Sequence, residues 1–582
     1  MPRLLLLPLA TLVALAANVS GAAADPIPEA PTTAPAFAGQ PATIQPAGAA
    51  AVPRHPFMAP DERSNLHDDA YQTDSYRRSG PLGIDVHRLS SQQGGLCGSV
   101  TFDAKGRIVT VCVGIDAVTL RLLDPVTLDS LAAYDLPPRS VGSGGLGTPF
   151  QNFTGGGYFY LDDRDRAVIP TADRHVLVMA ETAAPGFEVA RDIDLSAVVP
   201  SGDAIISALP DWQGRLWFAS RQGVVGTVAR DSPAIKVLRT GEPIGNSFAV
   251  GEAGDVYIVS DKALYRFEAA PDGAPRVVWR AVYPNDGTQK PGQSEHGSGT
   301  TPTLMGPDLV AITDNADPVD VIAYRRAPDV HGPRELCRAP VFAKGASSTD
   351  QSLLTDGRSL LAENNYGYQG PQSVSGGQTT KAGLARVDVH RDSGRCTVAW
   401  TSQVVAPSVV PKLALGSGVV YTYTKPGGDP SDPWFLTALD YRTGGTIYDA
   451  LAGAGPLFNN NYAPVTIGPD GTAYVGVLGG IVSLRDAAPP QVAPAPTIDV
   501  APAPPDRVRV AVTCGRGRIV VVATADRRVR ALVVRRGRRV ITDRHRPLRV
   551  RVRAGRALGV QAVLADGTRV RRTVGAARCR GR

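Results

Sequence analysis

One pattern recurs along most of this chain: a short apolar strand, a turn with Asp or Gly, and further strands in which apolar residues alternate. Clear copies begin at Asp103, Asp211, Gly251, Gly416 and Gly468. Neighbouring copies lie roughly 40 to 50 residues apart, a period typical of repeated supersecondary units. A unit of four short strands cannot bury its faces alone, so it must pack against copies of itself. The repeat therefore predicts an all-β chain folded as a β-propeller.

The number of repeats sets the number of blades. The segments that fit the pattern are 97–137, 150–196, 202–242, 244–284, 297–345, 347–409, 411–455 and 458–486. The last of these is one strand short. Gly80–Ser90, which precedes the first segment, is placed to supply that strand and to leave no sheet edge open. We expect an eight-bladed β-propeller closed by this N-terminal strand, with seven blades as the alternative.

The first 24 residues have the layout of an export signal. Arg3 precedes an apolar run, and Ala22 and Ala24 stand at the spacing of a cleavage site before Asp25. The run is shorter than the ~20 residues that span a bilayer. We therefore expect a signal peptide over 1–24 and a secreted mature chain with no transmembrane segment; an anchor that stays uncleaved is the alternative.

Two segments rich in Pro and Ala divide the rest of the chain. Residues 25–53 and 487–506 lack periodic apolar patterns, which is typical of extended linkers. The predicted domains are thus a propeller with an N-terminal arm over 54–486 and a smaller domain over 507–582.

The smaller domain has its own charge and pattern. From Pro505 to Arg582 there are 23 Arg, no Lys and 4 Asp, a net charge of +19, whereas the 38 basic and 50 acidic residues before them give −12. Its short alternating strands predict a small immunoglobulin-like β-sandwich. Such a basic surface favours an anionic polymer of the cell envelope as partner and a cell-wall-associated location; an Arg-rich but merely solvated face is the alternative. We expect a monomer, and no nucleic-acid partner, because export and the lack of aromatic residues disfavour one.

The chain has six cysteines and no C-x-x-C. In an exported protein an even number favours disulfides over metal ligands. Pairing neighbours in order is the simplest arrangement and gives Cys97–Cys112, Cys337–Cys396 and Cys514–Cys579. Free buried thiols are the alternative.

The stretch from Leu436 to Asp449 resembles a known blade motif. Ala438, Asp440, Thr443 and Gly444 match the A-x-D-x-x-T-G-x-x-x-W pattern of quinoprotein alcohol dehydrogenases, with Tyr448 at the Trp position. Looser copies occur at Arg121–Leu131 and Ala385–Trp400. The resemblance implies an eight-bladed propeller in which the turn and its aromatic ring dock one blade on the next.

That superfamily includes dehydrogenases that bind pyrroloquinoline quinone (PQQ) with calcium, and scaffolds without a cofactor. This chain lacks the adjacent Cys–Cys pair that many of the dehydrogenases place against the quinone. We therefore do not expect PQQ and keep calcium as the candidate cofactor.

Polar residues recur in the loops that precede the innermost strand of each predicted blade. Oxygen ligands from several blades suit a hard cation such as calcium. The predicted metal ligands are Asn152, Asp203, Asn246, Asp350 and Asn459. Because Asn and Asp are also common turn residues, a purely structural role is the alternative for each.

Glu295 and His296 have the chemistry of a general acid–base pair and stand before a Gly-rich turn. Asp314 with Asn315, and Glu363 to Asn365, are further cation candidates, with ordinary turns as the alternative.

The segment from Arg54 to Gly83 is neither a linker nor a strand pair. It contains His55, His67, Asp68 and Asp69 beside apolar residues. This mixture predicts an ordered arm that covers one mouth of the propeller. His67 followed by Asp68 and Asp69 is a possible set of metal ligands, and a solvated face is the alternative.

Two functions remain in view. The first is a secreted binding or scaffold propeller at the cell envelope. The second is a calcium-dependent propeller enzyme, a PQQ-type dehydrogenase or a lactonase- or esterase-like hydrolase, with its site on the axis. The chain has no G-x-S-x-G, H-E-x-x-H or P-loop pattern to favour a particular reaction.

Overall fold

The computed structural model describes residues 25–115, 117–139, 152, 154–330 and 332–500, and seven strands between Val508 and Val574. This described part is all-β and contains only two short 3₁₀ helices, η2 (Pro371–Val374) and η3 (Pro456–Phe458). It has no helix long and apolar enough to cross a membrane. The predicted signal peptide lies outside the described residues.

Seven sheets are each built on four consecutive antiparallel strands. In chain order they are β5 (Leu96–Phe102), β6 (Ile108–Val113), β7 (Val118–Leu123) and β8 (Ser130–Leu136); β9 (Tyr160–Leu161), β10 (Ala167–Pro170), β11 (His175–Glu181) and β12 (Phe187–Asp194); β13 (Ile205–Pro210), β14 (Leu216–Ser220), β15 (Val224–Val228) and β16 (Ile235–Arg239); β17 (Ala249–Val250), β18 (Val256–Val259), β19 (Ala263–Ala269) and β20 (Pro275–Val282); β21 (Thr303–Met305), β22 (Leu309–Thr313), β23 (Asp320–Arg325) and β24 (Glu335–Pro340); β25 (Leu354–Thr355), β26 (Ser359–Glu363), β27 (Leu384–His390) and β28 (Arg395–Ser402); and β29 (Lys412–Ala414), β30 (Val419–Thr424), β31 (Pro433–Asp440) and β32 (Thr446–Ala454). We number these sheets 1 to 7.

Sheet 8 joins distant parts of the chain. It contains β33 (Val465–Ile467), β34 (Ala473–Val477) and β35 (Gly480–Asp486), and its fourth strand is β4 (Val86–Gln92). β4 pairs antiparallel with β35 over its whole length, from Val86 opposite Asp486 to Gln92 opposite Gly480. The missing strand was predicted at Gly80–Ser90, so the paired strand lies slightly further along the chain.

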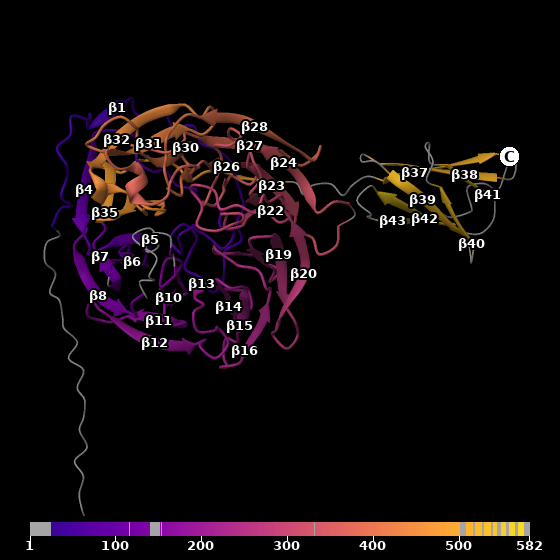
Figure 1. Ribbon diagram of the computed structural model, residues 1–582, viewed down its shortest axis with the longest axis horizontal. Coiled ribbons are helices and arrows are strands. Elements are labelled where there is room, and N and C mark those ends of the chain that lie inside the picture. The colour runs from indigo at the N-terminus through magenta and orange to yellow at the C-terminus, as the bar shows by residue number, and fades with distance from the viewer. Residues whose placement is uncertain are drawn as a thin grey trace, which may run out of the picture.

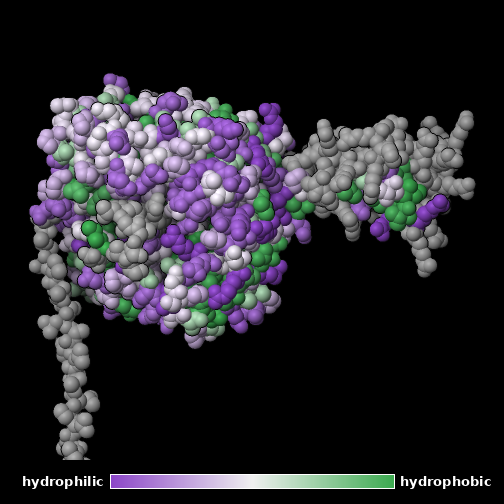
Figure 2. Space-filling model, viewed as in Figure 1, coloured by the Kyte–Doolittle hydropathy of each residue, from purple (hydrophilic) through white to green (hydrophobic). Residues whose placement is uncertain are grey.

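The sheets are arranged around a common centre, with their last strands outermost, which is the β-propeller arrangement (Figure 1). Buried apolar clusters fill the spaces between neighbours, and one of them joins Tyr474 and Ile481 of sheet 8 to Cys97 and Phe102 of sheet 1. The large apolar residues that are exposed are scattered, and the face shown in Figure 2 is largely hydrophilic. The core therefore lies between sheets rather than in one central cluster.

A shared turn shows why the repeats fold alike. In sheets 1 to 3, an Asp after the innermost strand accepts backbone N–H bonds from the residues two and four positions later. It also pairs with the Arg four positions later, which fixes the turn locally. The pairs are Asp103–Arg107, Asp162–Arg166 and Asp211–Arg215.

Two predicted disulfides are confirmed. Cys97–Cys112 joins β5 to β6 inside sheet 1, and Cys337–Cys396 joins the outer strands of sheets 5 and 6. The predicted Cys514–Cys579 pair cannot be placed, because Cys579 lies outside the described residues.

The two Pro/Ala-rich segments lie against the sheets wherever they are described. β1 (Phe37–Gly39) extends sheet 7 at β32, and β2 (Ala49–Ala50) pairs in parallel with β36 (Thr497–Ile498). Composition suggested linkers because these segments have no apolar period. They are extended, but their backbone groups pair with the propeller and with each other. The domain boundaries themselves stay predictions.

Seven further strands follow the propeller. They form a three-stranded sheet, β37 (Val508–Gly515), β38 (Arg518–Ala525) and β41 (Arg549–Arg553), and a four-stranded sheet, β40 (Arg539–Asp543), β39 (Val529–Arg536), β42 (Leu558–Leu564) and β43 (Arg569–Val574). Leu532, Val534, Val550 and Val560 are buried. The immunoglobulin-like assignment stays a prediction.

Candidate functional site

The arm, residues 54–83, lines the centre of the propeller. The innermost strand of each blade is a sheet edge whose N–H groups need partners. Backbone amides of these strands donate to carbonyls of the arm, and β3 (Ser75–Tyr76) runs parallel to β29 of sheet 7. The pairs are Phe102–Arg63, Leu161–Ser64, Val250–Ala70, Leu304–Tyr71, Thr355–Thr73, Leu413–Asp74 and Leu415–Tyr76.

Sheets 3 and 8 are contacted through side chains. The His55 ring lies 4.0 Å from the Trp212 ring after β13, centroid to centroid, and Arg78 donates to the Ile467 carbonyl of β33 at 2.6 Å. The arm thus contacts the innermost region of all eight sheets.

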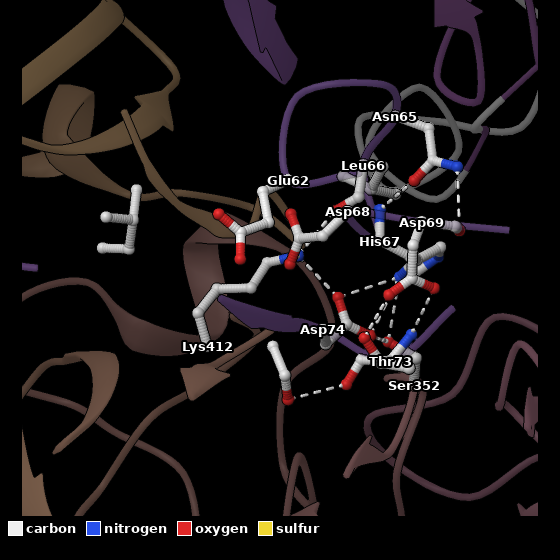
Figure 3. A network of polar contacts seen from close by, with 12 residues as sticks. Glu62, Asn65, Leu66, His67, Asp68, Asp69, Thr73, Asp74, Ser352 and Lys412 are labelled. Atoms are coloured by element: carbon white, nitrogen blue, oxygen red, sulfur yellow. Dashed lines mark hydrogen bonds and ion pairs between the residues drawn. The ribbon is translucent and has the colours of Figure 1, made fainter. Parts of the chain in front are cut away.

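A buried polar network holds the arm to sheet 7 (Figure 3). Lys412, on β29, has no solvent exposure. Its Nζ donates to Asp74 Oδ1 at 2.6 Å, to Asp68 Oδ2 at 3.1 Å and to the Leu66 carbonyl at 2.6 Å. The ammonium group is therefore compensated almost entirely by the arm.

The network sets the charge states of its members. Burial raises the pKa of Asp68 to about 6, although Lys412 opposes this. Burial also acts on Asp74, but His67 and Lys412 outweigh it and lower its pKa. Burial opposes the charge of Lys412, yet the two carboxylates raise its pKa above the ordinary value. A buried Lys that keeps its charge needs such partners.

Ser352, His67 and Asp74 lie together without forming a catalytic triad. Ser352 Oγ lies 3.1 Å from His67 Nδ1 and donates to Asp74 Oδ2 at 2.5 Å, and Asp74 itself lies 3.0 Å from the same Nδ1. A triad needs the nucleophile on one ring nitrogen and the carboxylate on the other. His67 Nε2 is buried and has no hydrogen-bond partner among the described residues. The arrangement positions the arm and does not activate the serine.

A cavity of about 200 Å³ lies beside this network, where the arm meets β2 and β36. We call it the arm cavity. Its apolar wall includes Val52, Leu304 and Leu415. Its polar wall includes the acidic residues Asp61, Glu62, Asp69 and Asp356, together with Tyr71, Thr73, Ser75 and Arg77.

The carboxylates of the arm cavity raise one another's pKa values. Burial, and then the charge of Glu62, raise the pKa of Asp61 to about 7, while Arg54 opposes them. Burial, and then the charge of Asp61, raise the pKa of Asp69 well above its usual range. Perturbed carboxyl groups in a cavity are a common mark of binding sites.

The predicted acid–base pair is not assembled as a pair. Arg221 donates to Glu295 Oε1 from Nε at 3.0 Å and from Nη2 at 2.5 Å. His296 is exposed, and its backbone carbonyl accepts hydrogen bonds from Asn285 and Asn315. Glu295 is thus neutralised by an arginine rather than by its neighbour.

The five predicted metal ligands each have local hydrogen-bond partners. Asn152 accepts from Thr154; Asp203 accepts from Ser220 and Gln222; Asn246 accepts from Tyr158; Asp350 accepts from the Ser294 amide; and Asn459 accepts from Tyr368. No group of three or more His, Cys, Asp or Glu in the described part is arranged to hold a metal ion. Asp350 is the exception in one respect, because its Oδ1 is buried without a partner.

The other cation candidates make local contacts, but Asp314 Oδ2, Asn315 Oδ1 and Glu363 Oε2 are buried without a hydrogen-bond partner among the described residues. Asp314 Oδ1 accepts the backbone N–H groups of Ala316 and Asp320, and Asn365 donates to Glu363 Oε1 at 2.6 Å.

The blade motif places rings between sheets 6, 7 and 8. Asp440 Oδ1 accepts the amides of Arg442 and Thr443, and a Cβ on Gly444 would stand 2.4 Å from the Trp400 ring of sheet 6. Tyr448 is buried and donates to the Pro81 carbonyl at 2.7 Å.

Sequence reasoning missed Lys412, Ser352 and Asp61. The available signal for Lys412 was a single lysine inside the apolar run from Val409 to Leu415. Ser352 and Asp61 gave no signal, because contacts with residues distant in sequence bring them into place.

No protein-family model matches the chain. An uncharacterized protein of Archaeoglobus fulgidus is 30% identical over 323 residues, which are 50% of this chain and 62% of that protein. The chain therefore spans less than two thirds of this relative's length.

Three solved structures give the scale of structural similarity. BamB from Moraxella catarrhalis is 14% identical, with a TM-score of 0.34 over 62% of this chain and 92% of its own. Streptogramin B lyase is 9% identical, with a TM-score of 0.34 over 69% and 98%. The WD40 β-propeller domain of Doa1 is 12% identical, with a TM-score of 0.32 over 56% and 89%. All three TM-scores are below 0.5, so these similarities carry no argument about the fold. The fold assignment rests on the strand pairing within the sheets of this chain.

Proposed function

We propose that this chain is an exported, eight-bladed β-propeller, closed by β4, that acts as a binding or scaffold module at the cell envelope. Seven four-stranded sheets and one six-stranded sheet, the β4–β35 pairing and the apolar cluster between sheets 8 and 1 support the closed ring. The leader-like first 24 residues and two disulfides support export.

The arm is the observation that carries the scaffold function. It lines the centre where propeller enzymes bind substrates, and its carboxylates neutralise Lys412. The residue types that acid–base chemistry requires, His67 and Glu295, are held by Asp74 and Arg221. A centre built this way suits a rigid platform that binds partners through its surface.

The Arg-rich strands after the propeller are the proposed attachment to an anionic envelope polymer. The test is co-sedimentation of the full chain with cell walls that carry such a polymer and with walls stripped of it. We expect binding to the first only, and weaker binding when Arg549, Arg551 and Arg553 on β41 are changed to Gln. Changing the exposed propeller residues Arg239, Arg395 and Arg442 is the matched control. Equal binding to both walls would contradict the proposal.

A calcium-dependent propeller enzyme is the second candidate. Asp350 favours it, because a buried carboxylate oxygen without a partner suits a cation. Metal analysis of the purified protein, with melting in EDTA, separates the two functions. The scaffold predicts no bound ion and no change in melting temperature. Bound calcium, or a quinone absorbance after incubation with PQQ, would favour the enzyme.

A further inference from the structure

The side-chain nitrogen of Lys412 is enclosed between sheet 7 and the arm, where it faces two carboxyl groups (Figure 3). Lys412 and Asp74 have no solvent exposure, and Asp68 is 1% exposed. Lys412 Nζ lies 2.6 Å from Asp74 Oδ1 and 3.1 Å from Asp68 Oδ2. An amine and two carboxyl groups from distant parts of the chain are thus held in contact away from bulk water.

The two carboxyl groups are held in different ways. Asp74 Oδ1 accepts from Lys412, and Asp74 Oδ2 accepts from Ser352 at 2.5 Å. His67 Nδ1 lies 3.0 Å from the same Oδ2. Asp68 meets Lys412 through Oδ2 alone, at the longer distance. Hydrogen bonds to the charged form stabilise a carboxylate, so Asp74 is the firmer anion and Asp68 is the carboxyl group that a nucleophile attacks more easily.

The ion pair between Lys412 and Asp68 is costly to keep in this place. Each buried ion loses several kcal/mol of solvation, which the attraction between the charges repays only in part. An amide between the same two groups carries no charge, and its formation removes one buried cation and one buried anion. Groups held at contact distance also react at a high effective concentration.

We propose that Lys412 and Asp68 join in an intramolecular amide, an isopeptide bond, that fixes the arm to sheet 7 with Asp74 as the proton carrier. Lys412 Nζ gives one proton to Asp74, and the freed lone pair forms a bond to Cγ of Asp68. One Cγ–O bond of Asp68 then breaks. Its oxygen leaves as water, with the proton that Asp74 returns and a second proton from the nitrogen. An ammonium and a carboxylate thus become an amide and water, and nothing is oxidised or reduced.

The same ion pairs set the pace of this reaction. Lys412 and Asp74 stabilise each other in their charged forms, so the first proton transfer is uphill. The bond should therefore form slowly after folding, and it should then persist because water has no access to it. This inference does not depend on the envelope function.

Mass spectrometry of the full chain, with its disulfides reduced, tests the bond directly. The intact mass should lie below the mass of the same sequence by one water molecule, about 18 Da. Digestion should give a branched peptide that joins Lys412 to Asp68. Lys412→Arg keeps the charge but should show the full mass, because its guanidinium stays protonated and is not a nucleophile. Asp74→Asn should leave most of the chain unlinked, because a positioned proton acceptor accelerates such a step about a hundredfold or more.

Lys425 is the matched control inside the same molecule. It is buried like Lys412, but its ion pair is with a single carboxylate, Asp432, at 2.7 Å. The digest should therefore show Lys425 and Asp432 without loss of water, and melting temperatures show that each variant is folded. The proposal fails if the unaltered chain has its full sequence mass or if Lys412→Arg still loses water. It also fails if the branch joins Asp74 instead of Asp68, or if Lys425 is linked as fully as Lys412.

Discussion

Lys412 illustrates how single residues fix the arm. It lies in an otherwise apolar run on the innermost strand β29, and Asp68 and Asp74 meet its ammonium group inside the protein. Four non-glycine residues of the arm, Glu62, Asp68, Gln72 and Asp74, have positive φ angles. Such conformations are costly, so the surrounding contacts must hold them.

Lys412→Met should therefore be strongly destabilising. The change leaves two buried carboxylates without their main cation, which costs on the order of 3 to 5 kcal/mol. Urea denaturation measures it, with Lys381→Met at an exposed position as the control. An unchanged midpoint would show that the ion pairs do not hold the arm.

Asp314 predicts a pH dependence. Burial raises its pKa to about 7, against the opposing hydrogen bonds from Asp320 and Ala316. Because the folded state holds the proton more tightly, this group's contribution to stability is full at low pH and is lost as pH rises from about 4 to 7. The side chain in the Asp314→Asn variant cannot ionise. Between about pH 4 and pH 7 the unaltered chain should therefore lose stability that the variant keeps, and the free energy of unfolding of the variant should rise relative to that of the unaltered chain. Denaturation at pH 4.5 and pH 8 measures the difference, and parallel pH profiles would contradict the assignment.

At the scale of elements, the repeat predicted much of the fold because local chemistry builds each blade. The Asp–Arg turns at Asp103, Asp162 and Asp211 are set by residues within four positions of one another. The candidate site was harder to predict from the sequence, because partners such as Asp74 and Lys412 are 338 residues apart. Composition also made 25–53 look like a linker, since strands as short as β1 and β2 have no detectable period.

Gly444 tests the contact between sheets 6 and 7. Its φ is +73°, and an added Cβ would meet the Trp400 ring. Gly444→Ala should lower the free energy of unfolding more than Gly428→Ala does. Gly428 also has a positive φ, +94°, but a Cβ added there would meet nothing within 4 Å. The backbone strain alone is about 1 to 2 kcal/mol. Equal losses in thermal denaturation would mean that the ring contact contributes nothing.

At the scale of the whole molecule, the propeller extends beyond its eight sheets. Ala495 and Thr497 contact Arg77 of the arm, and β36 pairs with β2. A chain ending at Val500 should therefore remain folded and acidic, whereas one ending at Pro490 should melt at a lower temperature. Equal melting temperatures would place the propeller's end before β36.

The central claim is a ring of eight sheets that β4 completes. Hydrogen exchange of the full chain, followed by mass spectrometry, tests it at Val86–Gln92. If β4 is the outer strand of sheet 8, the amides of Val86–Gln92 that face β35 should exchange slowly, whereas the alternate amides that face outward should exchange faster. Rapid exchange over Val86–Gln92, with β35 still protected, would show that the ring is not closed in this way.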